Sequence, residues 1–225
     1  MGLNYEKVKK FWEIRAGLAG EKLAVNLGTN EAQSAAQLEK IFSALGPSDR
    51  KIMDLGCGTG RLALPLAEAG KQVTAVDYVE PLLAALAEEA KNKGLQNIQT
   101  FCAACTDPLP VAYGSFDAVL ISGLMTYLND PEVDLLIANA ARLIRPEGKI
   151  IVRESVGTQG RFEVDKFSEE LKAEYQAIYR PTEDIEARFG AKGFFYVRSE
   201  KLYQQRKETG TWFWIFKRQA ETHSG

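Results

Sequence analysis

The sequence predicts an α/β fold, a doubly wound, seven-stranded, mostly parallel sheet with an antiparallel C-terminal hairpin and helices on both faces, hence three layers. Strand-like and helix-like runs alternate regularly from residue 51 to residue 155. A cluster of glycines directly follows the first strand-like run. Two strand-like runs close the chain, and the segment between them, Arg-Lys-Glu, is too short for a parallel crossover.

The alternating region contains five predicted strands, at 51–55, 71–77, 97–102, 115–122 and 149–155. The helices predicted between them lie at 61–70, 80–94 and 130–148. Pro81 falls in the first turn of the second of these helices, where a missing N–H is harmless. The run at 115–122 is apolar enough to be buried on both faces, as in a parallel sheet.

Outside that region, apolar residues at helical spacing predict helices at 4–16 and 30–45. Two more helices are predicted at 164–179 and at 181–193, the second opened by a proline. The closing strands are expected at 194–205 and 209–218, as an antiparallel hairpin. The length of 225 residues suits one domain with a full core.

Composition excludes several classes of protein. The 28 basic and 30 acidic residues leave a net charge of −2, so no general basic footprint for nucleic acid exists. No apolar run is long enough to span a bilayer, and the N-terminus lacks the apolar core of a signal peptide. Three cysteines, too few for a disulfide framework, suit a reduced compartment. We expect a cytoplasmic protein without nucleic-acid or membrane partners, either a monomer or a homodimer.

A zinc site is not expected. Cys102 and Cys105 form a C-x-x-C pair, but no second pair exists and the only histidine is His223 in a polar tail. Two small residues at a strand end explain the pair more simply.

The glycine cluster lies in "MDLGCGTG", residues 53–60. Gly56, Gly58 and Gly60 let backbone amides approach a ligand where a side chain would collide. Asp77 ends the next strand at the same sheet edge, where a carboxylate can accept two ribose hydroxyls. Dinucleotide-binding folds use this logic with a G-x-G-x-x-G loop, whereas the loop here reads G-C-G-T-G.

This loop resembles the D/E-x-G-x-G-x-G motif of the class I S-adenosylmethionine-dependent methyltransferases. The resemblance covers residues 51 to about 155 and includes Asp77, the "SFDAVLIS" strand and the "LIRPEGKIIV" helix-turn-strand. The terminal hairpin also fits, because the seventh strand of that family is antiparallel. The resemblance implies S-adenosylmethionine as cofactor, S-adenosylhomocysteine as product and one domain over 1–225. It further implies that residues 1–46 form a helical cap over the cofactor and that 156–193 form a helical insertion contributing to the acceptor pocket.

By the same resemblance, a set of residues at the strand ends is expected to bind the cofactor. Asp77 would bind the ribose hydroxyls, Tyr78 would pack on adenine, and Cys105 stands where an acidic residue normally meets the adenine amino group. Asp107 or a backbone carbonyl could supply that contact instead. Arg15, in an N-terminal W-x-x-R, could pair with the methionine carboxylate. The full set is Arg15, Asp54, Gly56, Cys57, Gly58, Gly60, Asp77, Tyr78, Cys105, Thr106, Ser122 and Gly123.

Methyl transfer from a sulfonium is an in-line displacement in which the protein mainly supplies position, a dry pocket and an electric field. Aromatic faces suit the positive sulfur, and Trp12, Tyr127 and Trp212 are candidates for them. Glu154, at the end of the fifth strand, is the best-placed carboxylate to act as a base, so Glu154 and Tyr127 are the candidate catalytic residues. The residues expected to contact the acceptor are Trp12, Tyr175, Tyr179, Arg180 and Trp212.

The sequence therefore predicts an enzyme that methylates N or O of a small molecule. A protein N-terminal or side-chain amine methyltransferase, a non-catalytic S-adenosylmethionine-binding module and a dinucleotide oxidoreductase stay open as alternatives. The stretch after the fourth strand, "SGLMTY", is not an N/D-P-P-Y tetrapeptide, which argues against the amino-methylating DNA enzymes. No Pro-Cys follows that strand either, as carbon-5 RNA or DNA methylation would need.

Overall fold

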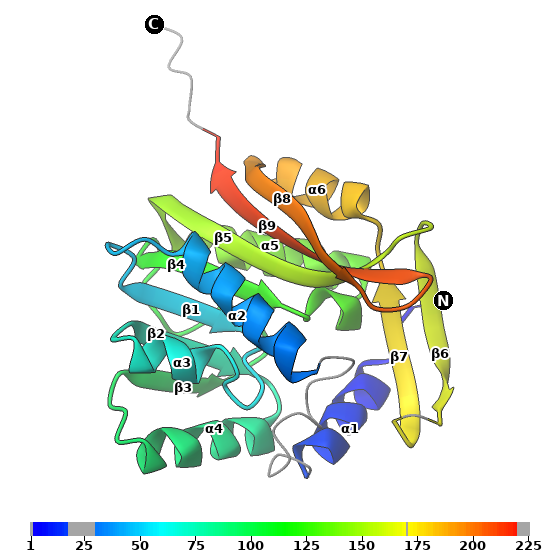
Figure 1. The fold of residues 1–225 in the computed structure, drawn as a ribbon, viewed down its shortest axis with the longest axis horizontal. Coiled ribbons are helices and arrows are strands. Elements are labelled where there is room, and N and C mark those ends of the chain that lie inside the picture. The colour runs from blue at the N-terminus through cyan, green and yellow to red at the C-terminus, as the bar shows by residue number, and fades with distance from the viewer. Residues whose placement is uncertain (1, 18–29, 170, 220–225) are drawn as a thin grey trace, which may run out of the picture.

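A computed structural model describes residues 2–17, 30–169 and 171–219. Its main sheet has seven strands in the order β3-β2-β1-β4-β5-β9-β8 (Figure 1). The strands β1 to β5 are parallel, β9 is antiparallel to β5, and β8 is antiparallel to β9. The seven strands are Lys51–Leu55 (β1), Gln72–Asp77 (β2), Ile98–Cys102 (β3), Phe116–Ser122 (β4), Ile144–Gly157 (β5), Phe194–Gln204 (β8) and Thr209–Arg218 (β9). The predicted sheet and its terminal hairpin are confirmed.

Helices cover both faces of this sheet, because successive strand residues point to opposite sides. On one face, side chains such as Ile52 and Leu120 form a buried core with α2, α3 and α4. On the other, Met53 and Val119 form a second core with α5 and α6. The helices are α1 (Tyr5–Ala16), α2 (Glu31–Ala44), α3 (Ala63–Glu68), α4 (Glu80–Asn92), α5 (Asp130–Leu143) and α6 (Thr182–Gly190), with a 3-10 turn η1 at Met125–Tyr127. The predicted three layers are present.

The predicted helix over 164–179 is wrong, and with it the expectation of a wholly helical insertion at 156–193. These residues form an antiparallel pair, β6 (Phe162–Ser168) and β7 (Ala173–Tyr179), followed by α6. Ala173, Tyr175, Ala177 and Tyr179 alternate along β7 and are buried in one cluster with Phe11 of α1. This packing of every second residue against one cluster favours a strand over the helix that the composition of the segment suggests. The two-stranded sheet lies beside α1 (Figure 1).

One predicted boundary also differs. The helix expected over 130–148 ends at Leu143, and β5 begins at Ile144. Pro146 disfavours a helical conformation at Arg145, and the pairing with β4 shifts register between Phe116 and Ala118 at this point.

The order of connections creates a crevice at one sheet edge. From β1 the chain proceeds outward to β2 and β3, and it then returns to place β4 on the other side of β1. Ligands of open α/β sheets bind outside the carboxyl ends of the strands at such a reversal. None of the described helices is long and apolar enough to cross a membrane.

Candidate active site

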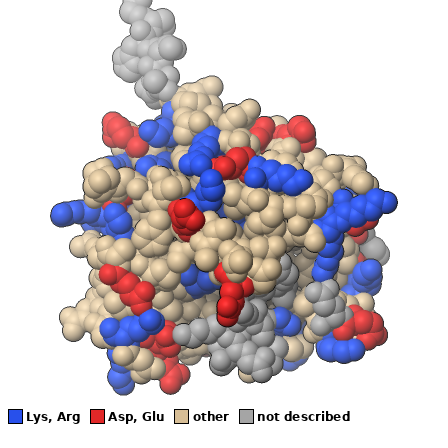
Figure 2. Space-filling view, in the orientation of Figure 1, with Lys and Arg blue, Asp and Glu red and all other residues tan. Residues whose placement is uncertain are grey.

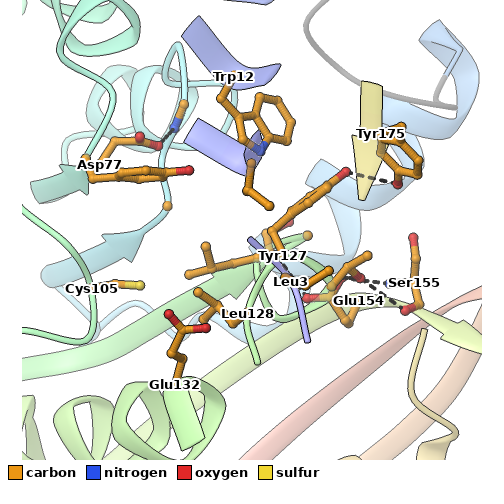
Figure 3. Close-up of a pocket in the computed structure, with 18 of the residues that line it drawn as sticks. Leu3, Trp12, Asp77, Cys105, Tyr127, Leu128, Glu132, Glu154, Ser155 and Tyr175 are labelled. Carbon is orange, nitrogen blue, oxygen red and sulfur yellow. Dashed lines mark hydrogen bonds between the residues drawn. The ribbon is translucent and has the colours of Figure 1, made fainter. Parts of the chain in front are cut away.

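A cavity of about 610 Å³ lies at this reversal, outside the carboxyl ends of β1, β2, β4 and β5 (Figure 3). The strand ends and the glycine loop form one part of its wall, here called the cofactor half. Tyr127 of η1, the pair β6–β7 and the β8–β9 turn form the other part, here called the acceptor half. Trp12 of α1 lines the cavity where the halves meet.

All three glycines of the loop have the left-handed backbone conformation, which favours glycine over other residues. Gly56, Gly58 and Gly60 have φ angles of 72°, 54° and 83°. A Cβ on Gly58 would meet nothing within 4 Å, so this glycine faces the open cavity. A Cβ on Gly60 would lie 2.3 Å from Cδ1 of Leu86, and Gly60 does not line the cavity. Gly60, which was also predicted to bind the cofactor, therefore allows α4 to pack closely on the loop.

Asp77 holds the glycine loop in place. Its carboxylate accepts hydrogen bonds from the backbone N–H groups of Gly58 at 2.9 Å and Val79 at 3.0 Å. Burial raises the pKa of Asp77, and these backbone hydrogen bonds oppose that shift. The carboxylate lines the cavity and keeps further lone pairs for a ligand.

Polar atoms without a partner mark the inner wall of the cofactor half. Oδ2 of Asp54 and Oγ of Ser122 are buried and make no hydrogen bond among the described residues. Burial is the main cause that raises the pKa of Asp54 to about 7, while Arg61 opposes the shift. Both residues line the cavity, as does Gly123. A buried acceptor that lacks a donor is costly, so this wall fits a ligand that donates hydrogen bonds.

Two arginines that the sequence interpretation did not assign to the cofactor line this wall. Nη1 of Arg61 donates to Gln37 at 2.8 Å, and Nη2 of Arg153 donates to the hydroxyl of Tyr203 at 3.2 Å. Burial and the nearby Arg153 lower the pKa of Arg61 to about 10, and Asp54 opposes that shift. Arg61 directly follows the glycine loop, which was the signal available in the sequence.

Arg15, predicted for this role, is buried but does not line the cavity.

Tyr78, Cys105 and Thr106 line the far end of the cofactor half, together with Cys57 of the loop. The ring of Tyr78 packs against Tyr5 with centroids 5.6 Å apart. Asn139 of α5 donates to the backbone carbonyls of both Cys105 and Asp107 at 3.0 Å, which fixes this loop. The side chain of Asp107 does not line the cavity, whereas Glu132, which the sequence interpretation missed, does.

Glu154, the predicted catalytic base, lines the cavity, but the protein itself occupies its carboxylate with hydrogen bonds. It is 1% exposed, and its carboxylate accepts four hydrogen bonds. Oε2 receives the N–H groups of Leu124 at 2.9 Å and Met125 at 2.7 Å. Oε1 receives the hydroxyl of Thr126 at 2.8 Å and the N–H of Ser155 at 3.0 Å. Burial raises its pKa, but no lone pair is left for a substrate proton, so Glu154 positions η1 instead.

Tyrosines dominate the acceptor half (Figure 3). The hydroxyl of Tyr127 lies 3.4 Å from that of Tyr175, which lies 2.9 Å from that of Tyr179. Trp12 packs edge-on against Tyr127 with centroids 5.1 Å apart. Burial is the largest cause that raises the pKa of each of the three tyrosines, so all three stay protonated near neutral pH.

Two predicted acceptor residues lie outside the cavity. Arg180 is 2% exposed and donates to Asp130 at 2.7 Å and to the carbonyls of Met125 and Leu128, both at 2.7 Å. It therefore ties η1 to the start of α5. Trp212 packs under Lys201, whose Nζ lies 5.2 Å from the ring centroid, and it does not line the cavity.

Comparison with known proteins agrees with this geometry. Residues 52–148 match a family model described as a methyltransferase domain. Phosphoethanolamine N-methyltransferase 1 of Arabidopsis thaliana is 30% identical over 162 residues, which cover 69% of this chain and 32% of that protein. A 23S rRNA (uracil(1939)-C(5))-methyltransferase of Pseudomonas fluorescens strain Pf-5 is 37% identical over 114 residues, 49% of this chain and 25% of that protein. The chain thus spans about a third or less of the length of these relatives.

The fold has a solved counterpart in 1,6-didemethyltoxoflavin-N1-methyltransferase of Burkholderia thailandensis, whose structure contains 1,6-didemethyltoxoflavin and S-adenosylhomocysteine. The TM-score is 0.70 at 17% identity, over 92% of this chain and 87% of that one. The strand order, the glycine loop with its two carboxylates and the family match lead to one conclusion. The chain has the fold of the class I S-adenosylmethionine-dependent methyltransferases, and its residues 52–148 match the model of a methyltransferase domain.

Proposed function

We propose that the protein is an enzyme that transfers a methyl group from S-adenosylmethionine to a nitrogen or oxygen atom of a small-molecule acceptor. One observation carries the proposal: a single cavity runs from the glycine loop and Asp77 to the tyrosines of the acceptor half. A donor and an acceptor bound in its two halves would meet near Trp12 and Tyr127.

The residues of the cofactor half suit each part of S-adenosylmethionine. Asp77 would accept the ribose hydroxyls beside the bare backbone of Gly58, and Tyr78 would pack against adenine. Asp54 and Ser122 offer unpartnered oxygen atoms to the methionine ammonium group. When bound, this cofactor supplies an electrophilic methyl group on a positively charged sulfur. The protein contributes position and exclusion of water.

The arginines of the cofactor half suit the methionine carboxylate. Arg61 and Arg153 both line the inner wall, where burial and repulsion from the charge of Arg153 lower the pKa of Arg61. An anionic group between them would relieve that repulsion, and guanidinium groups bind carboxylates well.

Enclosure of the cavity supports a small acceptor. Its volume of about 610 Å³ lies within the range of about 300–1,000 Å³ that is usual for small-molecule sites. Residues of β6, β7 and α1 line the acceptor half. On the face seen in Figure 2, basic and acidic side chains are interspersed, without the single-sign surface that a nucleic-acid substrate favours. The Arabidopsis and Burkholderia proteins are both named for small molecules.

The experiment that tests this proposal has two stages. Calorimetry should show 1:1 binding of S-adenosylhomocysteine and no binding of NAD. A mass-spectrometric screen with S-adenosylmethionine should then detect addition of one methyl group to members of a panel of small amines and alcohols. Methylation of peptides alone would favour a protein amine methyltransferase. Binding without any turnover would favour a non-catalytic module.

A further inference from the structure

The acceptor half contains a row of three phenolic hydroxyls. The hydroxyl oxygen of Tyr127 lies 3.4 Å from that of Tyr175, which lies 2.9 Å from that of Tyr179. All three residues line the cavity, and the hydroxyls of Tyr127 and Tyr175 point toward one another in Figure 3. Each hydroxyl has one proton and two lone pairs, so a row of three offers more acceptor sites than donors.

Further aromatic rings pack against the tyrosines of the row. Trp12 lies edge-on to Tyr127, and the ring of Phe162 stacks on Tyr179 with centroids 4.8 Å apart. Both residues also line the cavity. Aromatic faces attract cations, and such cages bind alkylammonium groups.

No carboxylate among the described residues is placed to remove a proton at this row. All four acceptor positions of Glu154 are occupied by donors of η1 and β5. Asp54 and Asp77 lie near the carboxyl ends of β1 and β2, in the cofactor half. Glu132 accepts the N–H of Asn129 at 2.6 Å as a cap of α5, and Glu208 is exposed on the β8–β9 turn.

We infer that the acceptor is an aliphatic amine, whose nitrogen is held by the row of Tyr127, Tyr175 and Tyr179 and enclosed by their rings. The inference rests on the proposed methyl transfer and narrows its acceptor class. In that reaction the lone pair of the neutral amine forms the new N–C bond. The electron pair of the breaking S–C bond stays on sulfur, and the positive charge moves from sulfur to nitrogen.

Near neutral pH an aliphatic amine is mainly an ammonium ion, which gives up its proton to solvent before the neutral form reacts. The transfer itself then needs no base, because the methylated nitrogen is a stable ammonium ion that keeps its charge. The tyrosine oxygens accept the remaining N–H groups, and the rings stabilise the charge that arrives on nitrogen. An alcohol would instead give a methylated oxonium ion, which must lose its proton at once to a nearby base. The protonated tyrosines and the occupied Glu154 do not supply one.

The test compares two ligands that differ in charge alone. Protein saturated with S-adenosylhomocysteine is titrated by NMR with choline, a quaternary ammonium, and with 3,3-dimethylbutan-1-ol, its neutral carbon isostere. Choline should bind at least about five-fold more tightly, since the cation–π contribution of a desolvated cage amounts to about that factor or more. Equal or weaker binding of choline overturns the inference, whether or not any compound is methylated.

Two variants test whether the row of tyrosines causes the preference for choline. Tyr127→Leu removes one face of the cage and should reduce the preference for choline at least about two-fold. Tyr113→Leu, on an exposed loop, is the matched control and should leave the preference unchanged. Unchanged preference in Tyr127→Leu contradicts the placement.

Turnover gives an independent result. Among acceptors matched except at the reacting atom, 2-phenylethylamine should be methylated in preference to 2-phenylethanol, and the reverse order overturns the inference. Failure to bind S-adenosylhomocysteine would instead count against the proposed function itself.

Discussion

Replacement of Glu154 by Gln distinguishes between two roles of this residue, that of a carboxylate that positions η1 and that of a catalytic base. A glutamine keeps one oxygen atom, so two of the four hydrogen bonds survive, and the amide N–H groups then face two donors. Each lost bond to a charged group is worth about 1.5–3 kcal/mol. Burial raises the pKa of Glu154, which means that its buried charge is unfavourable. Removal of that charge therefore offsets part of this loss. We expect a net decrease of about 2–4 kcal/mol in the free energy of unfolding.

In a chain of 225 residues, that decrease corresponds to a drop in Tm of about 5–15 °C. Thermal and urea unfolding of the wild type and the variant measure it. Thr126→Val is the matched control, because it removes one of the four donors and should cost only about 1–2 kcal/mol. If Glu154→Gln unfolds like the wild type but loses the acidic limb of the pH–rate profile, Glu154 is a base and the positioning role is refuted.

Other predictions concern the cofactor half. Asp77→Ala should weaken S-adenosylhomocysteine binding by about 1–3 kcal/mol in calorimetry, and unchanged affinity would contradict its assignment. Burial raises the pKa of Asp54 in the ligand-free protein from an ordinary value of 3.8 to about 7, so the native state binds more protons than the unfolded chain between these values. Stability of the free protein should therefore fall as pH rises through that window, and urea unfolding of Asp54→Asn should show a weaker fall. Gly60→Ala should destabilise the fold by about 2–4 kcal/mol in urea unfolding, because its Cβ meets Leu86, whereas Gly58→Ala should chiefly weaken cofactor binding. The opposite ranking of the two glycine variants would contradict the loop geometry.

The sequence was most informative where chemistry and topology coincide. Asp54, Gly58 and Asp77 follow directly from strand ends, and parallel strands bring their carboxyl ends to one edge. The strand order alone therefore predicts that these residues lie close together. The terminal hairpin was equally accessible, because a short charged segment between two strands leaves one geometry.

The sequence was misleading where tertiary packing decides. The insertion carries helix-favouring residues, yet β7 is a strand because Tyr175 and Tyr179 pack as alternate residues against α1 and η1. Local propensity does not contain that contact. The tyrosines were predicted to line the pocket, but their hydroxyl row depends on this strand geometry.

Roles of single charged residues were the hardest to predict. Glu154 was predicted to be a base and Arg180 to contact the acceptor. Both hold η1 instead, Glu154 through the N–H groups of η1 and Arg180 through its carbonyls. Their partners lie about 30 and 55 residues away in the chain, in a loop without a sequence signature. Arg61 was overlooked because a lone arginine after a glycine loop also suits a solvated helix start.

The most direct test of the central claim is a calorimetric titration of the wild-type protein with S-adenosylhomocysteine, with NAD as the comparison. If the glycine loop, Asp54 and Asp77 form an adenosyl-methionine site, S-adenosylhomocysteine binds at one site per chain and NAD does not bind. Binding of NAD without S-adenosylhomocysteine, or of neither, would contradict the account.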